Sequence, residues 1–318
     1  MPKIDLHCHL DGSMTLKSVE RILGREVQPW ELEAGNRCRN LAEYLDRFSL
    51  PLACLQTEEG LRMAAEEFLL DVARENTKYI EVRFAPLSSV HGHLQCRQVV
   101  EAVLDGLKAA EAQCGVSWNV IACAMRHHPQ EDSLAMMNVC RAYLGSGICA
   151  VDLAGDEASY PMESFRELFA QAKKLGFPFT IHAGECGCVE NVLEAVECGA
   201  ARIGHGIALK GHQAAQRQCA DRRIGIEMCP VSNLQTRAAE KDSYPIREFI
   251  NAGLLVTLNT DNRTVSGTSM TNEMEFVAQE YGITAKELNL FYRHAVEVSF
   301  ADDQMKHRLL ACAGMESI

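Results

Sequence analysis

Four histidines and two carboxylic acids in this sequence have the types and positions needed to bind a metal ion and activate water. They are His7, His9, His182, His205, Glu185 and Asp261. His7 and His9 are two residues apart, so on a strand both imidazoles point to the same side. Imidazole and carboxylate ligands around an open position favour zinc. The alternative is that each histidine is a hydrogen-bonded core residue.

All of these residues stand at the ends of short apolar runs that alternate with longer amphipathic stretches. We predict strands at residues 3–9, 79–86, 117–126, 148–156, 178–185, 202–206, 224–233 and 254–262. Helices are expected between them, with extra helices after the first strand and near the C-terminus, at 284–298 and 302–312. This order predicts an α/β fold, a (β/α)₈ TIM barrel, in which strand C-termini form the active face. The alternative is an open doubly wound sheet, but its Gly-x-Gly-x-x-Gly turn is missing from the sequence.

The composition fits a single domain over residues 1–318 and argues against several kinds of partner. Lys plus Arg total 31 and Asp plus Glu total 43, so the formal net charge is −12. Nucleic-acid binding would require clustered basic residues, which the sequence lacks. No apolar run approaches the roughly 20 residues that cross a membrane, so we expect no membrane partner. The sequence does not predict an oligomeric state.

The 14 cysteines are scattered along the chain and no export signal precedes them. This usage is typical of reduced thiols, so we expect a cytoplasmic protein. Cys38, Cys186 and Cys188 are conceivable zinc ligands, but no second close pair completes a four-thiolate site.

Six segments of the sequence resemble the adenosine deaminase family of metal-dependent hydrolases, most of all its bacterial members. They are DLHCHLDG (5–12), DLAGDE (152–157), HAGE (182–185), RIGHG (202–206), CPVSN (229–233) and NTD (259–261). They occur in family order and extend over nearly the whole chain. The His-x-His pair and the strand-eight Asp are shared by the wider amidohydrolase superfamily, whereas HAGE and LDG narrow the resemblance to purine deaminases.

The resemblance implies one zinc ion per chain, held by His7, His9, His182 and Asp261. It implies attack of a zinc-bound hydroxide on purine C6. His205 would hold and deprotonate the attacking water, and Asp261 would orient it as well as bind metal. Glu185 would protonate N1 of the ring, which requires a carboxyl with a raised pKa.

Four residues are expected to contact the substrate: His9, Asp11, Gly155 and Asn262. The resemblance places the Gly155 N–H at purine N3 and the Asp11 carboxylate at a ribose hydroxyl; Asp11 could instead be a turn residue before Gly12. The common family pattern has Asp-Pro after the metal-binding Asp, whereas this chain has Asn262-Arg263. An asparagine could donate its amide hydrogen to unprotonated N7.

Residues 41–56, which contain Phe48, resemble an apolar lid over the pocket, or else a barrel-capping helix pair. The resemblance implies hydrolytic deamination of the small molecules adenosine and 2'-deoxyadenosine to inosine and 2'-deoxyinosine plus ammonia, in purine salvage. One alternative is a deaminase of adenine or of a ribose-modified nucleoside such as aminodeoxyfutalosine. A catalytically silent binding module is disfavoured because no ligand is lost. Cytidine deaminases are excluded because Pro-Cys-x-x-Cys is missing.

Overall fold

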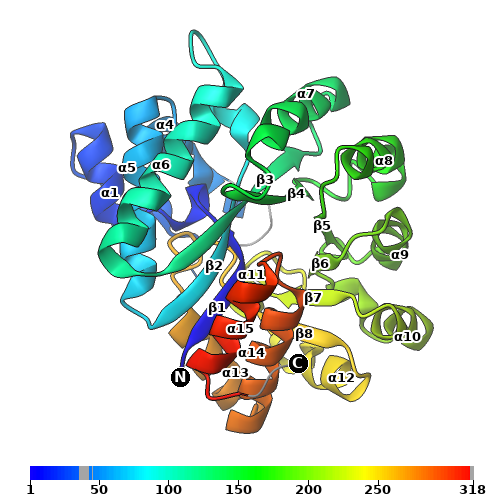
Figure 1. Cartoon of the computed structure of the whole chain (residues 1–318). Coiled ribbons are helices and arrows are strands. Elements are labelled where there is room, and N and C mark those ends of the chain that lie inside the picture. The colour runs from blue at the N-terminus through cyan, green and yellow to red at the C-terminus, as the bar shows by residue number, and fades with distance from the viewer. Residues whose placement is uncertain (36–42, 45, 316–318) are drawn as a thin grey trace.

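The barrel strands form two parallel halves in the computed structural model, which describes residues 1–35, 43–44 and 46–315. The strands are β1 (Lys3–His9), β2 (Thr77–Phe84), β3 (Ser117–Met125), β4 (Ile148–Ala154), β5 (Thr180–Ala183), β6 (Arg202–His205), β7 (Gly225–Met228) and β8 (Leu255–Leu258). They pair in the orders β1-β2-β3-β4 and β5-β6-β7-β8. Single parallel bridges, Val151 to Phe179 and Cys8 to Asp261, join the two halves. The predicted α/β barrel is confirmed (Figure 1).

Helices surround the strands (Figure 1). The outer helices are α5 (Glu58–Ala73), α6 (Cys96–Cys114), α7 (Gln130–Cys140), α8 (Arg166–Lys174), α9 (Val189–Cys198), α10 (Gln213–Asp221) and α12 (Ile246–Asn251). Their apolar faces and the strands share one buried core, as expected for strands covered on both faces. None of the described helices is long and apolar enough to span a membrane.

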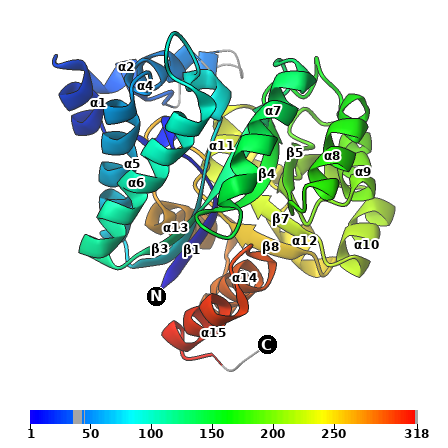
Figure 2. The same cartoon turned by 45° about the horizontal axis from the view of Figure 1, so that its top comes forward.

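The extra helices expected after the first strand and at the C-terminus are present. The first group is α1 (Leu16–Leu23), α2 (Pro29–Leu32) and α4 (Ser49–Cys54). The second group is α13 (Met270–Tyr281), α14 (Ala285–Val298) and α15 (Asp303–Cys312). Side chains of α14 and α15 pack against Ile4, Leu6 and Tyr79. Helices α14 and α15 therefore cover the N-terminal end of the barrel, opposite the strand ends that carry the histidines (Figure 2).

Two elements differ most from the sequence prediction, and β5 and β8 are also shorter than the strands expected at 178–185 and 254–262. Residues 224–233 were expected to form one strand, but β7 ends at Met228 and residues Pro230–Gln235 form the short helix α11. Proline at the first helical position explains the change, because its fixed φ suits a helix start and it cannot donate to a sheet. Helix α13 was not predicted; Ser269 caps its N-terminus and Gly282 ends it in a left-handed conformation.

Candidate metal and deamination site

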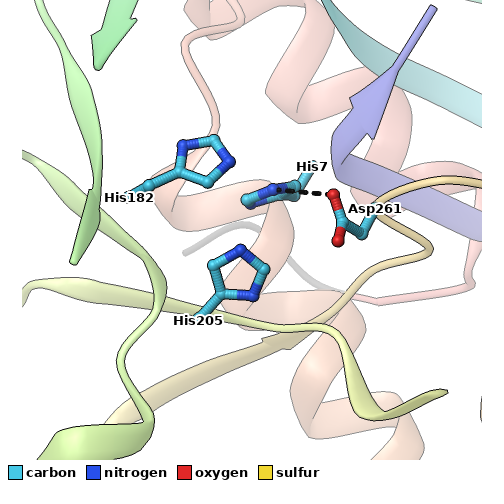
Figure 3. A group of neighbouring side chains, drawn as sticks. All are labelled: His7, His182, His205 and Asp261. Carbon is cyan, nitrogen blue, oxygen red and sulfur yellow. Dashed lines mark ion pairs between the residues drawn. The ribbon is translucent and has the colours of Figure 1, made fainter. Parts of the chain in front are cut away.

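Four buried side chains meet at the C-terminal ends of the strands. His7 lies in β1 two residues before its end, His182 lies in β5, His205 ends β6 and Asp261 follows β8. One ligand atom from each lies within 4.8 Å of the others. Figure 3 shows these side chains pointing toward one another, with His7 Nε2 3.4 Å from Asp261 Oδ1. The barrel therefore brings together residues that are far apart in the sequence.

His9 lies at the edge of this group. Its Nε2 is 3.2 Å from His182 Nε2 and 3.5 Å from Asp261 Oδ1. Burial lowers the pKa of His9 well below its ordinary value, which keeps the imidazole neutral and able to act as a ligand. The predicted ligands His7, His9, His182 and Asp261 thus converge, and His205 shares the same space.

The donor set fits a divalent metal ion. His7 Nε2 is buried and has no hydrogen-bond partner among the described residues. A buried polar atom without a partner is costly unless an ion or water satisfies it. Nitrogen and carboxylate donors at this spacing suit zinc. Cys186 and Cys188 do not belong to the group, and Cys38 lies outside the described residues.

A charged network beneath the site orients two of the histidines. His7 Nδ1 lies 2.8 Å from Glu227 Oε2, and His182 Nδ1 lies 2.9 Å from Asp152 Oδ2. Arg83 bridges the two carboxylates at 2.9 Å each. A carboxylate behind a histidine fixes its tautomer and ring orientation. No role for Arg83 or Glu227 was predicted from the sequence, although charged residues inside apolar strands indicate buried ion pairs.

The network keeps its carboxylates ionised. Burial opposes the charged form of Glu227, but Arg83 and Arg202 outweigh it and hold the pKa of Glu227 well below its usual range. Burial likewise acts against ionised Asp152, but His182 and Arg83 lower its pKa. All of these arginine and carboxylate side chains are fully buried.

Neutral groups hold the other two members of the cluster. Ser232 Oγ donates to Asp261 Oδ2 at 2.5 Å. Asn233 Nδ2 lies 2.9 Å from His205 Nδ1, and Tyr244 donates its hydroxyl to Asn233 Oδ1 at 3.1 Å. Ser232 and Asn233 are adjacent on α11. Both residues belong to the CPVSN motif, but their role was not predicted from the sequence.

The backbone at His205 and Asp261 is in the left-handed region, with φ of 66° and 58°. Such conformations cost a non-glycine residue roughly 1–3 kcal/mol and persist where surrounding contacts impose them. At Asp261 the contacts are backbone hydrogen bonds to β1: its N–H donates to His7 O at 2.8 Å, and its carbonyl accepts from His9 N–H at 2.7 Å. The strain marks both positions as functional candidates.

A cavity of about 360 Å³ opens beside the cluster. Its lining includes Glu185 and all four predicted substrate contacts, which are His9, Asp11, Gly155 and Asn262. From the expected lid, Phe48 and Leu52 reach the cavity, while residues 41, 42 and 45 lie outside the described part of the chain.

Glu185 and His205 both line the cavity. Its Oε1 accepts from Thr236 Oγ1 at 3.1 Å, and its Oε2 is 3.8 Å from His205 Nε2. Buried Glu157 accepts hydrogen bonds from the backbone N–H groups of residues 184, 185 and 186, at 2.7, 2.9 and 3.2 Å. Glu157 therefore fixes the loop that carries Glu185, a role the sequence did not predict.

The predicted substrate contacts differ in their local environment. Burial raises the pKa of Asp11 to about 6, although Gly12 N–H donates to its carboxylate. Gly155 has φ of +105°, a conformation that side chains rarely adopt. Asn262 Oδ1 is buried and has no hydrogen-bond partner among the described residues. A Cβ on Gly12 would lie 1.9 Å from that oxygen, so glycine is required there for Asn262 to fit.

Comparison with known proteins agrees with this geometry. The family model described as Adenosine deaminase matches residues 2–313. An adenosine deaminase of Enterococcus faecalis is 39% identical over 319 residues, covering 97% of this chain and 95% of that protein.

Two solved structures share the fold. An adenine deaminase of Arthrobacter aurescens has a TM-score of 0.87 at 23% identity, covering 97% of this chain and 96% of that one. An amidohydrolase of Burkholderia ambifaria, solved with bound Zn, has a TM-score of 0.86 at 22% identity, covering 99% of this chain and 90% of that one.

Proposed function

The chain belongs to the adenosine deaminase family, and from that premise we propose that it hydrolyses adenosine and 2'-deoxyadenosine to inosine and 2'-deoxyinosine with release of ammonia. The observation that carries the proposal is the meeting of a metal-ligand group and Glu185 at one cavity. We further propose that the enzyme acts in the cytoplasm, in purine salvage.

We propose that His7, His9, His182 and Asp261 hold one zinc ion. The unsatisfied Nε2 of His7 and the short distances from His9 to His182 and Asp261 support this set. Bound zinc supplies the lowered pKa, to about 7, that makes water a nucleophile at neutral pH.

His205 holds the attacking water in the proposed reaction. Tyr244 donates to Asn233 Oδ1, and the Asn233 amide lies 2.9 Å from His205 Nδ1, so these contacts fix the orientation of the ring. The other ring nitrogen, Nε2, faces Glu185. In the proposed reaction His205 also takes the proton of the water it holds.

Glu185 supplies the proton to purine N1 as C6 becomes tetrahedral. A positioned general acid contributes roughly 10²–10⁴-fold to a rate. Its hydrogen bond from Thr236 and the contacts of Glu157 to its loop support a fixed orientation.

The cavity lining favours an uncharged nucleoside. Among the described residues that line it there are four carboxylic acids and neither lysine nor arginine. A 5'-phosphate would therefore lack a cationic partner. Asp11 offers a carboxylate to a ribose hydroxyl, which free adenine lacks, so we place adenine second. We also place aminodeoxyfutalosine second, because the curated relatives are named adenosine deaminases. Gly155 N–H would meet purine N3, and Asn262 would donate its amide to N7.

The test measures ammonia release by the purified, metal-analysed protein from adenosine, 2'-deoxyadenosine, adenine and aminodeoxyfutalosine, with and without a zinc chelator. We expect chelator-sensitive turnover of the first two. Turnover of adenine alone would contradict the substrate assignment.

Replacing Glu185 tests the mechanism. Glu185→Gln should lower kcat by roughly 10²–10⁴-fold because the proton donor is lost, while zinc content stays unchanged. The matched control is Glu190→Gln, at an exposed position on α9, which should keep wild-type kcat. Full activity of Glu185→Gln would exclude Glu185 as the acid.

A further inference from the structure

Glu273 is a fully buried carboxyl on α13 that the proposed reaction does not use. Its Oε2 accepts from the backbone N–H of Val231 at 3.2 Å. Its Oε1 accepts from Thr268 Oγ1 at 2.8 Å. It has no ion-pair partner among lysines and arginines in the described part of the chain. Both of its hydrogen-bond partners are therefore neutral.

The contact to Val231 fixes the start of α11. The first N–H groups of a helix have no partner inside the helix, and Val231 is the second residue of α11. The next two residues are Ser232 and Asn233, which bind Asp261 and His205. Glu273 thus supports helix α11, whose residues Ser232 and Asn233 contact Asp261 and His205.

The surroundings of Glu273 favour its neutral form. Burial raises the pKa of Glu273 to about 8 and outweighs the hydrogen bonds from Thr268 and Val231, which favour the ionised form. Among the described residues, the strongest charge influences on Glu273 come from two acids, Asp5 and Asp261, and Glu273 in turn raises the pKa of Cys229, Tyr244 and Tyr281. Ionising Glu273 would therefore place a second negative charge near Asp261 without a counter-charge.

We propose that Glu273 is a positioning residue, whose buried carboxyl fixes α11 and thereby orients Asp261 and His205 for turnover. The inference rests on the proposed function. Ionisation of Glu273 disturbs the orientation of α11 and slows the chemical step, and it leaves purine binding unchanged because Glu273 does not line the cavity.

The test compares kcat and KM for adenosine between pH 6 and 10 in the zinc-loaded wild type and in Glu273→Gln. Glutamine can keep both hydrogen bonds, accepting from Val231 N–H and donating to Thr268, and it cannot ionise. We expect wild-type kcat to fall about tenfold per pH unit above about pH 8, with KM within twofold. Glu273→Gln should keep its kcat for at least about one further pH unit.

Two more variants separate positioning from simple packing. Glu273→Ala leaves Val231 N–H unsatisfied and should lower kcat about tenfold or more at pH 7. Glu275→Gln, at an exposed position on the same helix, should keep the wild-type pH profile. Val277→Ala removes buried volume from α13 and should lower stability while keeping that profile.

Stability gives a readout independent of activity. Because the folded-state pKa of Glu273 is raised, its stabilising contribution is fully present below the ordinary pKa of 4.5 and is lost as pH rises toward about 8. The unfolding equilibrium of wild type relative to Glu273→Gln should shift about tenfold per pH unit over this range.

The outcomes are distinct. Turnover of adenosine by the wild type at pH 7 reports on the proposed function alone. An alkaline decline in kcat that is identical in wild type and Glu273→Gln would overturn the role of Glu273, as would unchanged kcat in folded Glu273→Ala.

Discussion

Glu227 and Glu273 are both fully buried, yet their environments are opposite. Glu227 lies beneath His7 between Arg83 and Arg202, and these cations hold its pKa well below the usual range. Glu273 lies behind α11 with only neutral hydrogen-bond donors, and burial raises its pKa to about 8. Charged side chains therefore support His7 and His182, whereas neutral groups support Asp261 and His205.

The two kinds of support should respond differently to mutation. A buried ion network is costly to break because each partner left behind is an unpaired charge in a low dielectric. A neutral hydrogen bond contributes less, so its loss should change alignment more than stability. Three substitutions test whether charged and neutral support differ in this way.

The largest effect is expected from Arg83→Met. It removes the cation that bridges Asp152 and Glu227, so both carboxylates lose a buried partner. The free energy of unfolding should fall by about 3–5 kcal/mol, measured by urea denaturation. Arg62→Met, which breaks the exposed pair with Glu66, is the control and should cost at most about 1 kcal/mol. Equal costs for the two variants would show that the network does not stabilise the fold.

A smaller effect is expected from Glu227→Gln, which keeps the size of the side chain and removes the charge behind His7. Zinc affinity, measured by competition with a chelator of known affinity, should fall about 10–100-fold. Glu59→Gln, at an exposed position on α5, should leave it unchanged. Wild-type affinity in Glu227→Gln would mean that His7 does not bind the metal or does not need its carboxylate.

The smallest effect is expected from Tyr244→Phe, which removes the hydroxyl that orients the Asn233 amide. Stability should fall by about 1 kcal/mol, and kcat for adenosine should fall less than about tenfold because Asn233 can rotate away from His205. Tyr292→Phe removes a hydroxyl bonded to Leu309 O, far from the site, and should cost similar stability with unchanged kcat. A larger loss of stability in Tyr244→Phe than in Arg83→Met would mean that the neutral groups stabilise the fold more than the charged network does.

Local patterns in the sequence were sufficient to predict the barrel. Short runs that lead into His7, His182 and His205 and alternate with longer amphipathic stretches identify barrel strands whose C-terminal ends form one face. The pattern failed at Pro230, where apolar residues continue past the strand and only the proline indicates a helix. It also failed at α13, whose cap residues Ser269 and Gly282 are visible in the sequence but whose apolar periodicity is weak.

The residues that touch the cavity were easier to predict than those that support them. Asp11, Gly155 and Asn262 follow strand ends, and all three line the cavity. Glu227 is a single acidic residue in an apolar run, and Glu273 stands in a polar stretch with Glu275 nearby, so the sequence does not show which of them meets an arginine. That depends on tertiary contacts between β2 and β7, and between α11 and α13.

The bridge between Cys8 and Asp261 has a consequence for the order of events in folding. The first and last strands are joined at the residues that also bring Asp261 against His7 and His9. Contacts between such distant parts of a chain form late, because loop closure must precede them. During synthesis, His7 and His9 are made early, whereas Asp261 is added more than 250 residues later. We therefore expect the complete ligand group to assemble only when the barrel closes, so that metal uptake is among the final steps of maturation.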